Sequence, residues 1–579
     1  MSSLEAVKNK ANARGEKPQK DPMGHLYVEE ILRNADFQGD ISTNKEDLEA
    51  FSTDESIFSV RPQIVIAPKS KKDLEIAVKV IDVHTATFPT LSLTPRAAGT
   101  GLSGGSLTDS IVVDVKKYLN SVGEFNEKEN TITVGPGVMF PVVEKILKEH
   151  GRYLPAFPAS KDICAIGGCV GNNCAGPDSL RFGHFAESVA SLEVVLKDGN
   201  TYTLKPLSFN GYKALIQQKN AHAEIAKEVY TLIKKNEKEL REARPKTKKN
   251  TAGYALWDVV SPSIKEFEAG RGTFDLTRLV SGSQGTIGIL SGVTLKTEPI
   301  HDNTVLLTVP VYELEKAGEL ITHILQYNPI NVELFDGASM ELAVANPYFF
   351  RDRIPGFNFY RFLLSLYTTY NFTYRRKAPE FTLLITIDTE ATEHSANEIV
   401  AATKKATGLP IRIVNGAHKK DMFWQVRGAS YTISKLQDET KRPAAFLEDM
   451  TVPPENISAF FLDIKKLLTK HKVSAAVHGH GGNGHLHFYP LLDFTQDQGD
   501  KVEAMAEDFF NTAIKYKGNI CGEHNDGIIR TPQLSKIFNK KTLGLFKELE
   551  HLFDPKDIFN PGKKVNPRYD IKKYLRHTN

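Results

Sequence analysis

The hydrophobic positions of this chain follow strand and helix periods in two successive regions, and each region mixes both kinds of element. From Pro62 to His84 the pattern predicts a strand, a turn and an amphipathic helix. Later in the first region it predicts strands at residues 91–96, 111–115 and 131–137, and helices at residues 141–150 and 225–240. Residues 1–57 are polar and helix-prone and are interpreted as an N-terminal extension.

The second region begins near His301, where a strand–helix–strand pattern occurs twice. The predicted strands and helices are at residues 305–309, 314–326 and 331–335 in the first copy and at 382–387, 396–407 and 411–414 in the second. A doubled β-α-β unit predicts a ferredoxin-like sheet with helices on one face.

An insert at residues 347–377 separates the two copies and concentrates aromatic side chains among basic ones. Its members include Tyr348, Phe357, Tyr360, Phe372, Arg351, Arg353, Arg361, Arg375, Arg376 and Lys377. Aromatic and basic residues together suit a membrane interface. The alternative is that the aromatic side chains pack against the neighbouring sheet, and the sequence leaves both open.

Four histidines surround a glycine-rich reversal at residues 475–490, which read AAVHGHGGNGHLHFYP. They are His478, His480, His485 and His487. Each glycine costs a helix about 1 kcal/mol, so two short strands joined by a tight turn are expected. Residues two apart in a strand share a face, which brings several imidazoles to one point, as a metal ion requires. A second fragment adds Glu523 and His524.

Composition narrows the class of protein. The 579 residues provide for two or three domains, and a net charge of only +3 argues against a nucleic-acid partner. Four cysteines are too few for a disulfide scaffold. The sequence shows neither a secretory signal nor a run of about 18 apolar residues. A cytoplasmic protein is expected, and it would contact the inner membrane peripherally if the insert faces lipid.

The most glycine-rich loop contains G-x-G-x-x-G at Gly99, Gly101 and Gly104. A dinucleotide fingerprint also needs a helix directly after the glycines, whereas a β-branched strand follows here, so the Rossmann interpretation fails. The loop is instead expected to hold a diphosphate with its backbone N–H groups and the hydroxyls of Thr100 and Ser103.

Two further loops, at residues 160–183 and 281–290, are low in side-chain bulk. Small residues let the backbone approach a flat ligand closely. Cys164, Cys169 and Cys174 are evenly spaced within the first of these loops. An iron–sulfur cluster is not favoured, because no fourth cysteine is nearby and the spacing is not that of a known cluster site.

In this order the three loops resemble the FAD-linked oxidases of the vanillyl-alcohol-oxidase (PCMH) type. The histidine-rich and Glu-His segments resemble the D-2-hydroxyacid dehydrogenase branch, which includes D-lactate and D-2-hydroxyglutarate dehydrogenases. The resemblance implies an α+β fold. Its parts are a two-part FAD-binding domain at residues 58–298, a cap at 299–501 and a C-terminal segment at 502–579 that returns to the flavin.

The resemblance also implies which residues contact FAD. In the first loop these are Ala98, Gly99, Thr100, Gly101, Leu102, Ser103, Gly104 and Gly105. In the second and third loops they are Ser160, Gly167, Gly168, Asn173, Ser179, Gly183, Ser283, Gln284, Gly285 and Ile289, and near the C-terminus Asn560 and Lys563.

A metal site and a reaction follow from the same resemblance. His480, His487 and Glu523 match the ligands of a divalent metal, with Zn or Mn expected. Arg427 matches the arginine that binds the substrate carboxylate, and His524 takes the hydroxyl proton while hydride leaves Cα for FAD. Electrons then pass to a quinone, a cytochrome or an electron-transfer protein. In an extended chain consecutive residues point to opposite sides, so Glu523 and His524 are expected to face the ion and the substrate respectively.

Three positions depart from the family pattern. His485 stands where relatives have asparagine, Gln284 replaces a glutamate, and Leu447 falls where a basic residue for a distal carboxylate is expected. The substrate's side chain therefore stays open. The alternatives are a flavin oxidase of aryl alcohols or sugars, and an FAD-bearing subunit of a larger redox complex. A structural zinc domain is least favoured, because such sites are usually cysteine-rich and closed.

Overall fold

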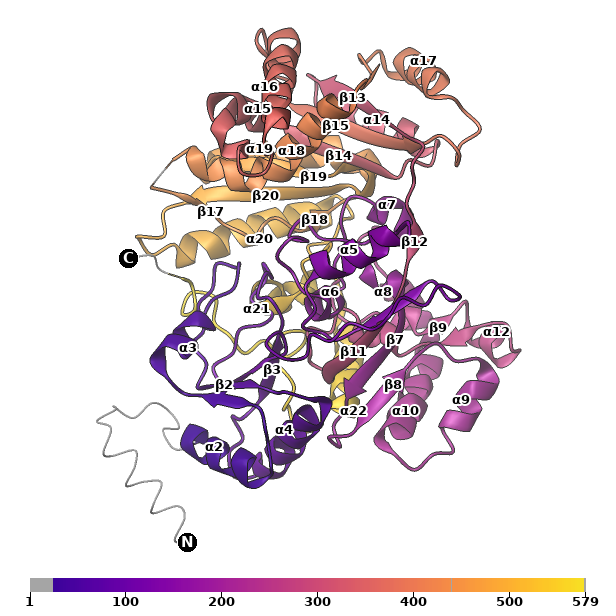
Figure 1. Cartoon of the computed structure of the whole chain (residues 1–579), viewed down its shortest axis with the longest axis vertical. Coiled ribbons are helices and arrows are strands. Elements are labelled where there is room, and N and C mark those ends of the chain that lie inside the picture. Colours follow the sequence, from indigo (N-terminus) through magenta and orange to yellow (C-terminus); the bar gives the residue numbers. More distant parts are fainter. Residues whose placement is uncertain (1–23, 439, 577–579) are drawn as a thin grey trace.

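The computed structural model describes residues 24–438 and 440–576, so residues 1–23 of the N-terminal extension lie outside the described range. The molecule is elongated (Figure 1). The first half of the chain forms the lower α/β region in that view, and residues beyond about 300 form the upper one. The C-terminal segment then runs back from the upper region to the lower one (Figure 1).

Four short strands form the first sheet of the lower region, in the order β1-β2-β4-β3. β2 (Ile64–Ala67), β4 (Ile111–Asp114) and β3 (Leu93–Arg96) are parallel, and β1 (Asp40–Ser42) adds an antiparallel edge. The buried face of α4 (Lys71–His84) packs against these strands. The predicted strand, turn and helix are confirmed, and the glycine-rich loop joins β3 to β4 without a helix, as expected.

A second antiparallel sheet has the order β5-β11-β7-β8. Its strands are β5 (Thr131–Val134), β11 (Ile289–Lys296), β7 (Val189–Val195) and β8 (Thr201–Leu204). The chain enters β11 directly from the third glycine loop. The two sheets therefore present the first and third loops to one another across the lower region.

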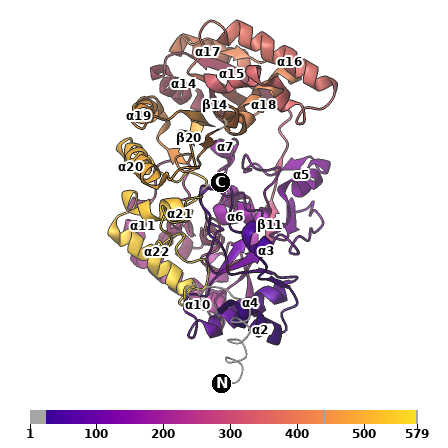
Figure 2. The same ribbon diagram turned by 90° about the vertical axis from the view of Figure 1, so that its left-hand side faces the viewer.

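The helix predicted at residues 225–240 is wrong in its extent. The structure has α10 (Ala221–Lys235) and α11 (Glu237–Ala243), with a break at Asn236, whose φ is −118°. This residue is far from helical φ, and its side chain bonds back to the Leu232 carbonyl. Both helices pack beside α22 (Lys540–Phe553) from the C-terminal segment (Figure 2).

The upper region is built on a mixed-length antiparallel sheet in the order β16-β13-β15-β14-β19-β20-β17. Its first four strands are β16 (Arg412–Ile413), β13 (Thr304–Val311), β15 (Phe381–Asp388) and β14 (Asn331–Asp336). Numbered along the chain, they have the order 4-1-3-2 of a ferredoxin-like sheet, so the predicted doubled unit is confirmed. The strands β19 (Ala475–His480), β20 (His485–Leu492) and β17 (Arg442–Pro443) extend it.

Helices cover both faces of this sheet, so the expectation of helices on one face is wrong. One face carries α14 (Glu315–Leu325), α17 (Ala396–Thr407) and α19 (Ile457–Lys470), and the other carries α15 (Gly337–Ala345), α16 (Phe357–Thr369) and α18 (Ala417–Ile433). The physical reason lies in β13 and β15. Leu306 and Leu384 pack into one core cluster, while their neighbours Leu307 and Leu383 pack into the other.

The aromatic insert divides into a buried and an exposed set. Phe350, Phe359, Phe362 and Tyr374 lie in the core beside α18, which confirms the packing alternative for these residues. Tyr348, Phe357, Tyr360 and Phe372 are exposed. Among the described helices, none combines the length and the apolar content needed to cross a lipid bilayer.

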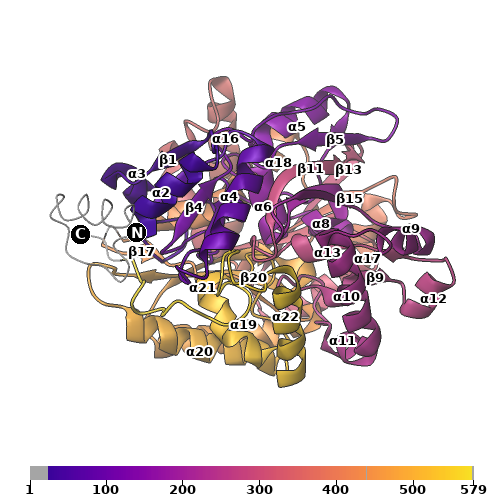
Figure 3. The ribbon, with the colours of Figure 1, turned by 90° about the horizontal axis from the view of Figure 1, so that it is seen from below.

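The C-terminal segment connects the two regions. α20 (Gly499–Lys515) packs beside α19 (Figure 3), and α22 returns to the lower region. Ile558 and Phe559 then join the core of the first sheet. The Leu93 N–H donates to the Ile558 carbonyl at 2.7 Å, and the Asn560 N–H donates to the Leu93 carbonyl at 3.0 Å. The segment thus runs directly beside β3, next to the first glycine loop.

Candidate active site

A tight hairpin in the upper sheet carries the four histidines. In the register of β19 and β20, His478 lies opposite His487 and His480 lies opposite His485. Gly484 ends the turn with φ of 64°, and a Cβ there would lie 1.8 Å from a backbone carbonyl oxygen. Only glycine fits this close approach. The two strands and the turn predicted from the sequence are confirmed.

The hairpin and the segment after α20 bring four potential metal ligands together. One donor atom from each of His480, His485, His487 and Glu523 lies within 4.8 Å of the others, and all four side chains are buried. The Nε2 atoms of His480 and His487 lie 3.2 and 3.4 Å from Glu523 Oε1. Ligands bonded at about 2.0–2.2 Å in a tetrahedral site are about 3.4 Å apart, so the cluster fits a divalent ion.

Hydrogen bonds at the other ring nitrogen orient both of these histidines. His480 Nδ1 lies 2.6 Å from Glu333 Oε1, and His487 Nδ1 donates to the Glu448 carbonyl. Both partners are acceptors, so Nδ1 carries the hydrogen and Nε2 is left free to ligate. This arrangement is the one expected of histidines that bind a metal ion.

His485 is the departure from the family pattern, and the structure places it inside the cluster. Its side chain is fully buried and its Nε2 lies 3.1 Å from Asp449 Oδ1. Among the described residues, neither ring nitrogen has a hydrogen-bond partner of good geometry. Burial lowers the pKa of His485 well below its usual value, so the ring is neutral and one of its nitrogens is free to ligate a metal ion.

Arg427 lies in α18, beside the cluster, and is paired with a carboxylate that the sequence did not single out. Its Nε donates to Glu333 Oε2 at 3.0 Å, and a terminal nitrogen lies 2.7 Å from the same oxygen. Burial raises the pKa of Glu333, but His480 and Arg427 outweigh this and hold it below its usual value. Glu333 is therefore an ionised carboxylate shared by a predicted metal ligand and the predicted substrate-binding arginine.

Glu523 is held from the other side by Lys249, which the sequence showed only as part of a basic run. The ammonium of Lys249 donates to Glu523 Oε2, and both side chains are buried. Burial raises the pKa of Glu523, but the neighbouring Lys249 and His480 outweigh it and keep the pKa well below its usual value. One carboxylate oxygen thus meets Lys249, while Oε1 faces the histidines.

The expectation that Glu523 and His524 point to opposite sides is wrong, because this segment is a bend and not a strand. Asp449 holds the bend by accepting both backbone N–H groups, at 2.8 and 2.9 Å. His524 Nε2 lies 3.6 Å from Glu523 Oε1, and its Nδ1 lies 3.0 Å from Glu448 Oε1. Burial lowers the pKa of His524, but Asp449 and Glu448 outweigh it and raise the net value.

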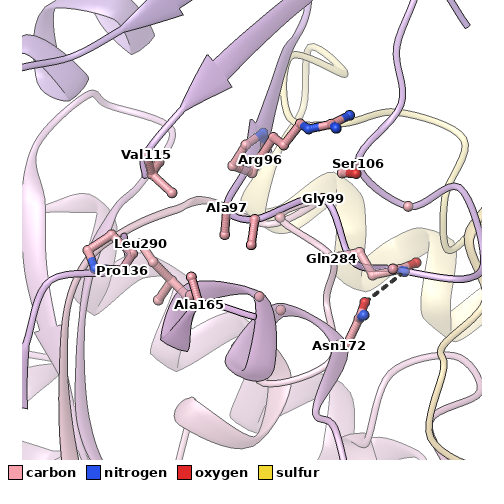
Figure 4. A pocket seen from close by; sticks show the side chains of 18 of the residues that line it. Arg96, Ala97, Gly99, Ser106, Val115, Pro136, Ala165, Asn172, Gln284 and Leu290 are labelled. Carbon is pink, nitrogen blue, oxygen red and sulfur yellow. Dashed lines mark hydrogen bonds between the residues drawn. The ribbon is translucent and has the colours of Figure 1, made fainter. Parts of the chain in front are cut away.

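A groove of about 860 Å³, including the part open to solvent, lies in the lower region (Figure 4). It is lined by Ala98, Gly99, Thr100, Gly101, Ser103 and Gly105 of the first loop, Gly167 and Gly168 of the second, and Ser283, Gln284 and Gly285 of the third. The three loops predicted to share one ligand therefore face one cavity.

The glycines of this groove leave space that packing does not need. A Cβ built on Gly101 or Gly168 would meet no atom closer than 3.7 Å, and one on Gly171 would meet nothing within 4 Å. Side chains at these positions would fill the groove. Bare backbone around an open, elongated cavity is suited to a flat, phosphate-bearing ligand such as FAD.

The remaining predicted FAD residues do not line the groove. These are Leu102, Gly104, Ser160, Asn173, Ser179, Gly183, Ile289, Asn560 and Lys563. Several of them support its walls. Asn560 Nδ2 donates to the carbonyls of Gly105 and Gln284 at 2.8 and 2.7 Å, and Asn173 Oδ1 accepts the Ala186 N–H at 2.9 Å.

A hydrogen-bond network links the groove to the histidine cluster. Gln284 Nε2 donates to Asn172 Oδ1 at 3.1 Å (Figure 4), and Gln284 Oε1 accepts the Gly527 N–H at 2.9 Å. Asn525, directly after His524, donates to the Asn172 carbonyl at 3.1 Å. The groove and the candidate metal site therefore adjoin one another and form parts of one site.

Sequence reasoning missed Glu333, Lys249 and Asp449. A signal existed for each: a carboxylate in the middle of the apolar strand NVELFD, a lysine at the end of a basic run, and an acidic pair before a buried strand. Such residues are almost never fully buried unless they are paired. Their partners lie far away in the sequence, however, and no local pattern names them.

Two family models match the stretches of the chain that contain the two parts of this site. Residues 62–205 match the model of an FAD binding domain, and residues 300–564 match that of the FAD linked oxidases, C-terminal domain. The chain carries an FAD binding domain and the C-terminal domain of the FAD-linked oxidases. The match to the FAD binding domain lies in the lower region, and the histidine cluster lies within the matched C-terminal domain.

Two relatives show the range of names in the family. The chain is 26% identical to the D-2-hydroxyglutarate dehydrogenase of Haemophilus influenzae, covering 94% of this chain and 52% of the relative. It is 22% identical to the mitochondrial D-lactate dehydrogenase [cytochrome] of Kluyveromyces lactis, covering 90% and 78%. The chain thus spans about half the length of the first relatives it matches.

The fold itself is shared with solved structures of distant sequence. The 4-ethylphenol oxidase from Gulosibacter chungangensis superposes with a TM-score of 0.65 at 13% identity, covering 93% of this chain and 97% of that one. The predicted α+β fold with a PCMH-type FAD-binding domain is confirmed.

Proposed function

We propose that this FAD-linked oxidase oxidises a D-2-hydroxyacid to the 2-oxoacid, with the divalent ion and FAD as its two cofactors. The observation that carries the proposal is the position of the cluster. His480, His487, Glu523 and Arg427 lie together, next to the groove that suits FAD. A hydroxyacid has a hydroxyl and a carboxylate on adjacent carbons, and this site offers a partner for each.

Each residue then has a distinct task. His480, His487 and Glu523 would hold the ion, which when bound lowers the pKa of the substrate hydroxyl. Arg427 would bind the substrate carboxylate with the N–H groups that Glu333 does not use. His524 would take the hydroxyl proton at Nε2, because Glu448 holds its Nδ1. FAD bound in the groove would supply the two-electron acceptor for the Cα hydride.

Two names among the relatives support the substrate class. They are D-2-hydroxyglutarate and D-lactate dehydrogenase, which share the D-2-hydroxyacid group. Leu447, where a basic residue for a distal carboxylate was expected, is fully buried and apolar. Leu447 offers no charge to a second carboxylate of the substrate. The proposed substrate is therefore the D-2-hydroxyacid class, and the following experiment identifies the substrate's side chain.

The test is anaerobic bleaching of the flavin spectrum by a panel of D- and L-2-hydroxyacids that differ in side-chain length and charge. We expect the D-isomers to bleach the oxidised flavin and the L-isomers to leave it unchanged. A flavin that no 2-hydroxyacid reduces, in protein that contains both FAD and metal, would overturn the proposal.

The electrons must then reach a quinone, a cytochrome or an electron-transfer protein, and the exposed side of α16 supports a membrane-bound acceptor. We define the α16 patch as the exposed aromatic residues Tyr348, Phe357, Tyr360 and Phe372 with the exposed basic residues Arg351, Arg353, Arg361, Arg375, Arg376 and Lys377. Aromatic rings that are about 70% exposed or more, surrounded by positive charge, suit an anionic lipid surface.

Vesicle binding tests the α16 patch. We expect the FAD-loaded protein to sediment with vesicles that contain phosphatidylglycerol but not with neutral phosphatidylcholine vesicles. Replacing Phe357 and Tyr360 by serine should reduce this binding without affecting flavin reduction. Val83→Ser, an equally exposed apolar position on α4, is the control. If the wild type ignores anionic vesicles, the membrane role is wrong.

A second candidate is an FAD-bearing subunit of a larger redox complex. The observation that favours it is the name of another relative: the chain is 25% identical to the glycolate oxidase subunit GlcD of Bacillus subtilis, covering 87% of this chain and 89% of the relative. Co-purification of the native protein with a second polypeptide that accepts electrons from the reduced flavin would support it.

A further inference from the structure

Glu333 is a fully buried carboxylate of the site, and it lies on the central strand β14. Its neighbours in the strand, Val332 and Leu334, are core residues, and the Glu333 side chain is itself fully buried. A carboxylate in such a position is costly unless other groups pair with it. Its partners therefore explain why the strand carries it.

The two oxygens of Glu333 serve two different elements. Oε1 is 2.6 Å from His480 Nδ1 on β19, and Oε2 accepts from Arg427 on α18, with Nε at 3.0 Å and a terminal nitrogen at 2.7 Å. Among the described residues, each hydrogen bond and ion pair of this carboxylate is with one of two residues. One is a predicted ligand of the metal, and the other is the predicted partner of the substrate carboxylate.

We propose that Glu333 is a positioning residue that couples the metal site to the substrate-carboxylate site. This inference rests on the proposed function. By accepting from His480 Nδ1, Glu333 fixes the tautomer whose Nε2 can ligate the ion. By accepting from two nitrogens of Arg427, it fixes the plane of the guanidinium and leaves the remaining N–H groups for the substrate. A disturbance of either partner is passed to the other through one carboxylate.

The coupling depends on an acceptor at both ends, which glutamine cannot supply. If the amide oxygen of Glu333→Gln faces Arg427, its NH₂ group faces His480, whose Nδ1 must then accept and whose Nε2 carries the hydrogen. If the oxygen faces His480, the NH₂ group meets the donors of Arg427 instead. Either orientation keeps one partner and loses the other.

The experiment compares FAD-loaded wild type with Glu333→Gln by two measurements. Mn²⁺ and Zn²⁺ affinities are measured by competition with a chelator, and KM and the rate of flavin reduction are measured with whichever D-2-hydroxyacid bleaches the wild type. We expect FAD to be retained, with either a metal affinity about 10–100-fold weaker or a KM raised by a similar factor. Unchanged values for both measurements would overturn the inference.

Asp336→Asn is the matched control, because Asp336 lies on the same strand and accepts the N–H groups of Ser339 and Val477, both at 2.8 Å. It contacts neither His480 nor Arg427 among the described residues. We expect its metal affinity to match the wild type. An equal loss in Asp336→Asn would show a general disturbance of β14 and overturn the inference.

Arg427→Lys keeps the proposal testable if Glu333→Gln fails to hold FAD. Arg427 does not reach the predicted metal ligands except through Glu333, so coupling predicts a several-fold weaker metal affinity in this variant. An unchanged affinity would overturn the coupling. A wild type that binds neither metal nor hydroxyacid would overturn the proposed function and this inference together. A wild type that binds both, with Glu333→Gln equal to it, would overturn the inference alone.

Discussion

The two halves of the candidate site achieve binding by opposite means. The groove in the lower region is a surface of bare backbone, in which three loops of small residues leave space for a ligand. The cluster in the upper region is filled with buried charge: Glu333, Glu448, Asp449 and Glu523 face Arg427, Arg530 and Lys249. The groove is defined by small side chains that leave space, and the cluster by buried charges that pair with one another.

The difference predicts how each half responds to change. In the groove, the effect of a substitution should grow with the volume that it adds, because the ligand competes with the new side chain for space. In the cluster, removing one charge leaves its partner buried and unpaired, which is far more costly than the loss of the contact itself. Substitutions in the cluster should therefore have the larger and more abrupt effects.

The carboxylates of the two halves also differ in charge. Glu333 and Glu523 lie among cations, which hold their pKa values low. Glu550 lies under the third glycine loop, where its partner is the hydroxyl of Tyr254. Burial raises the pKa of Glu550 to about 8, so this carboxyl is neutral at pH 7. A neutral carboxyl therefore lies in the lower region, whereas Glu333 and Glu523 in the cluster are ionised.

The largest effect is expected for Glu523→Ala. This change removes a metal ligand and leaves the Lys249 ammonium buried without its partner, which costs about 3–5 kcal/mol of stability. We expect metal content and hydroxyacid-dependent flavin reduction to fall to background, measured by elemental analysis and rapid mixing. The control is Glu507→Ala on the exposed side of α20. Metal content equal to that of the wild type would contradict the ligand assignment.

His524→Ala should retain both FAD and metal, because the imidazole is assigned to neither. We expect flavin reduction to slow by about 10²–10⁴-fold, the usual effect of removing a positioned general base. Rapid-mixing measurements and metal analysis on the same samples separate this result from a lost ligand. If the variant loses its metal or keeps the wild-type rate, the base is another residue, and His485 is the first to examine.

Gly101→Val tests the groove. The added side chain would occupy ligand space, and overpacking typically costs about 1–3 kcal/mol, which weakens FAD binding by about 5- to 150-fold. FAD affinity is measured by fluorescence titration of the flavin-free protein. Gly544→Val on α22, where a Cβ would also meet nothing within 4 Å, is the control. Equal FAD affinity in the Gly101 and Gly544 variants would show that the glycines are not needed for the ligand.

The smallest expected effect is the change in stability that Glu550 causes as pH rises. The direction of this change follows from the raised pKa of Glu550. Between about pH 5 and the folded-state pKa of about 8, the unfolded chain releases this proton while the native state keeps it. The stability contributed by Glu550 therefore falls as pH rises through this window. We expect the thermal midpoint of Glu550→Gln to decline less than that of the wild type between pH 5 and pH 8. Parallel declines would show that Glu550 is ionised.

Much of the fold could be predicted because its signals are local. The strand, turn and helix at the start of the first sheet follow from hydrophobic periods and a serine cap, and the hairpin follows from its glycines. The second layer of helices on the upper sheet could not be predicted as easily. It depends on paired leucines such as Leu306 and Leu307, which show that both faces are apolar, whereas the doubled unit suggested only one covered face.

The candidate site divides in the same way. Its histidines are close in sequence and were found, while Glu333 and Lys249 lie 94 and 274 residues from the partners that explain them. A buried pair is a property of the folded chain, so neither member shows it alone. The relation of Glu523 to His524 was wrong for a related reason: Asp449, 74 residues away, bends a segment that its own sequence suggests to be extended.

The Lys249–Glu523 pair has a consequence for how the proposed metal ion would enter the site. In many metal sites the converging carboxylates repel one another until a cation binds. Folding of the protein and binding of the metal ion then occur together. Here Lys249 supplies a positive charge from within the chain, and the three ligands already stand at ligand spacing. We expect the polypeptide to fold first and to bind the metal ion afterwards. A chelator should therefore remove the ion without unfolding the protein, and the metal-free protein should bind a different divalent ion.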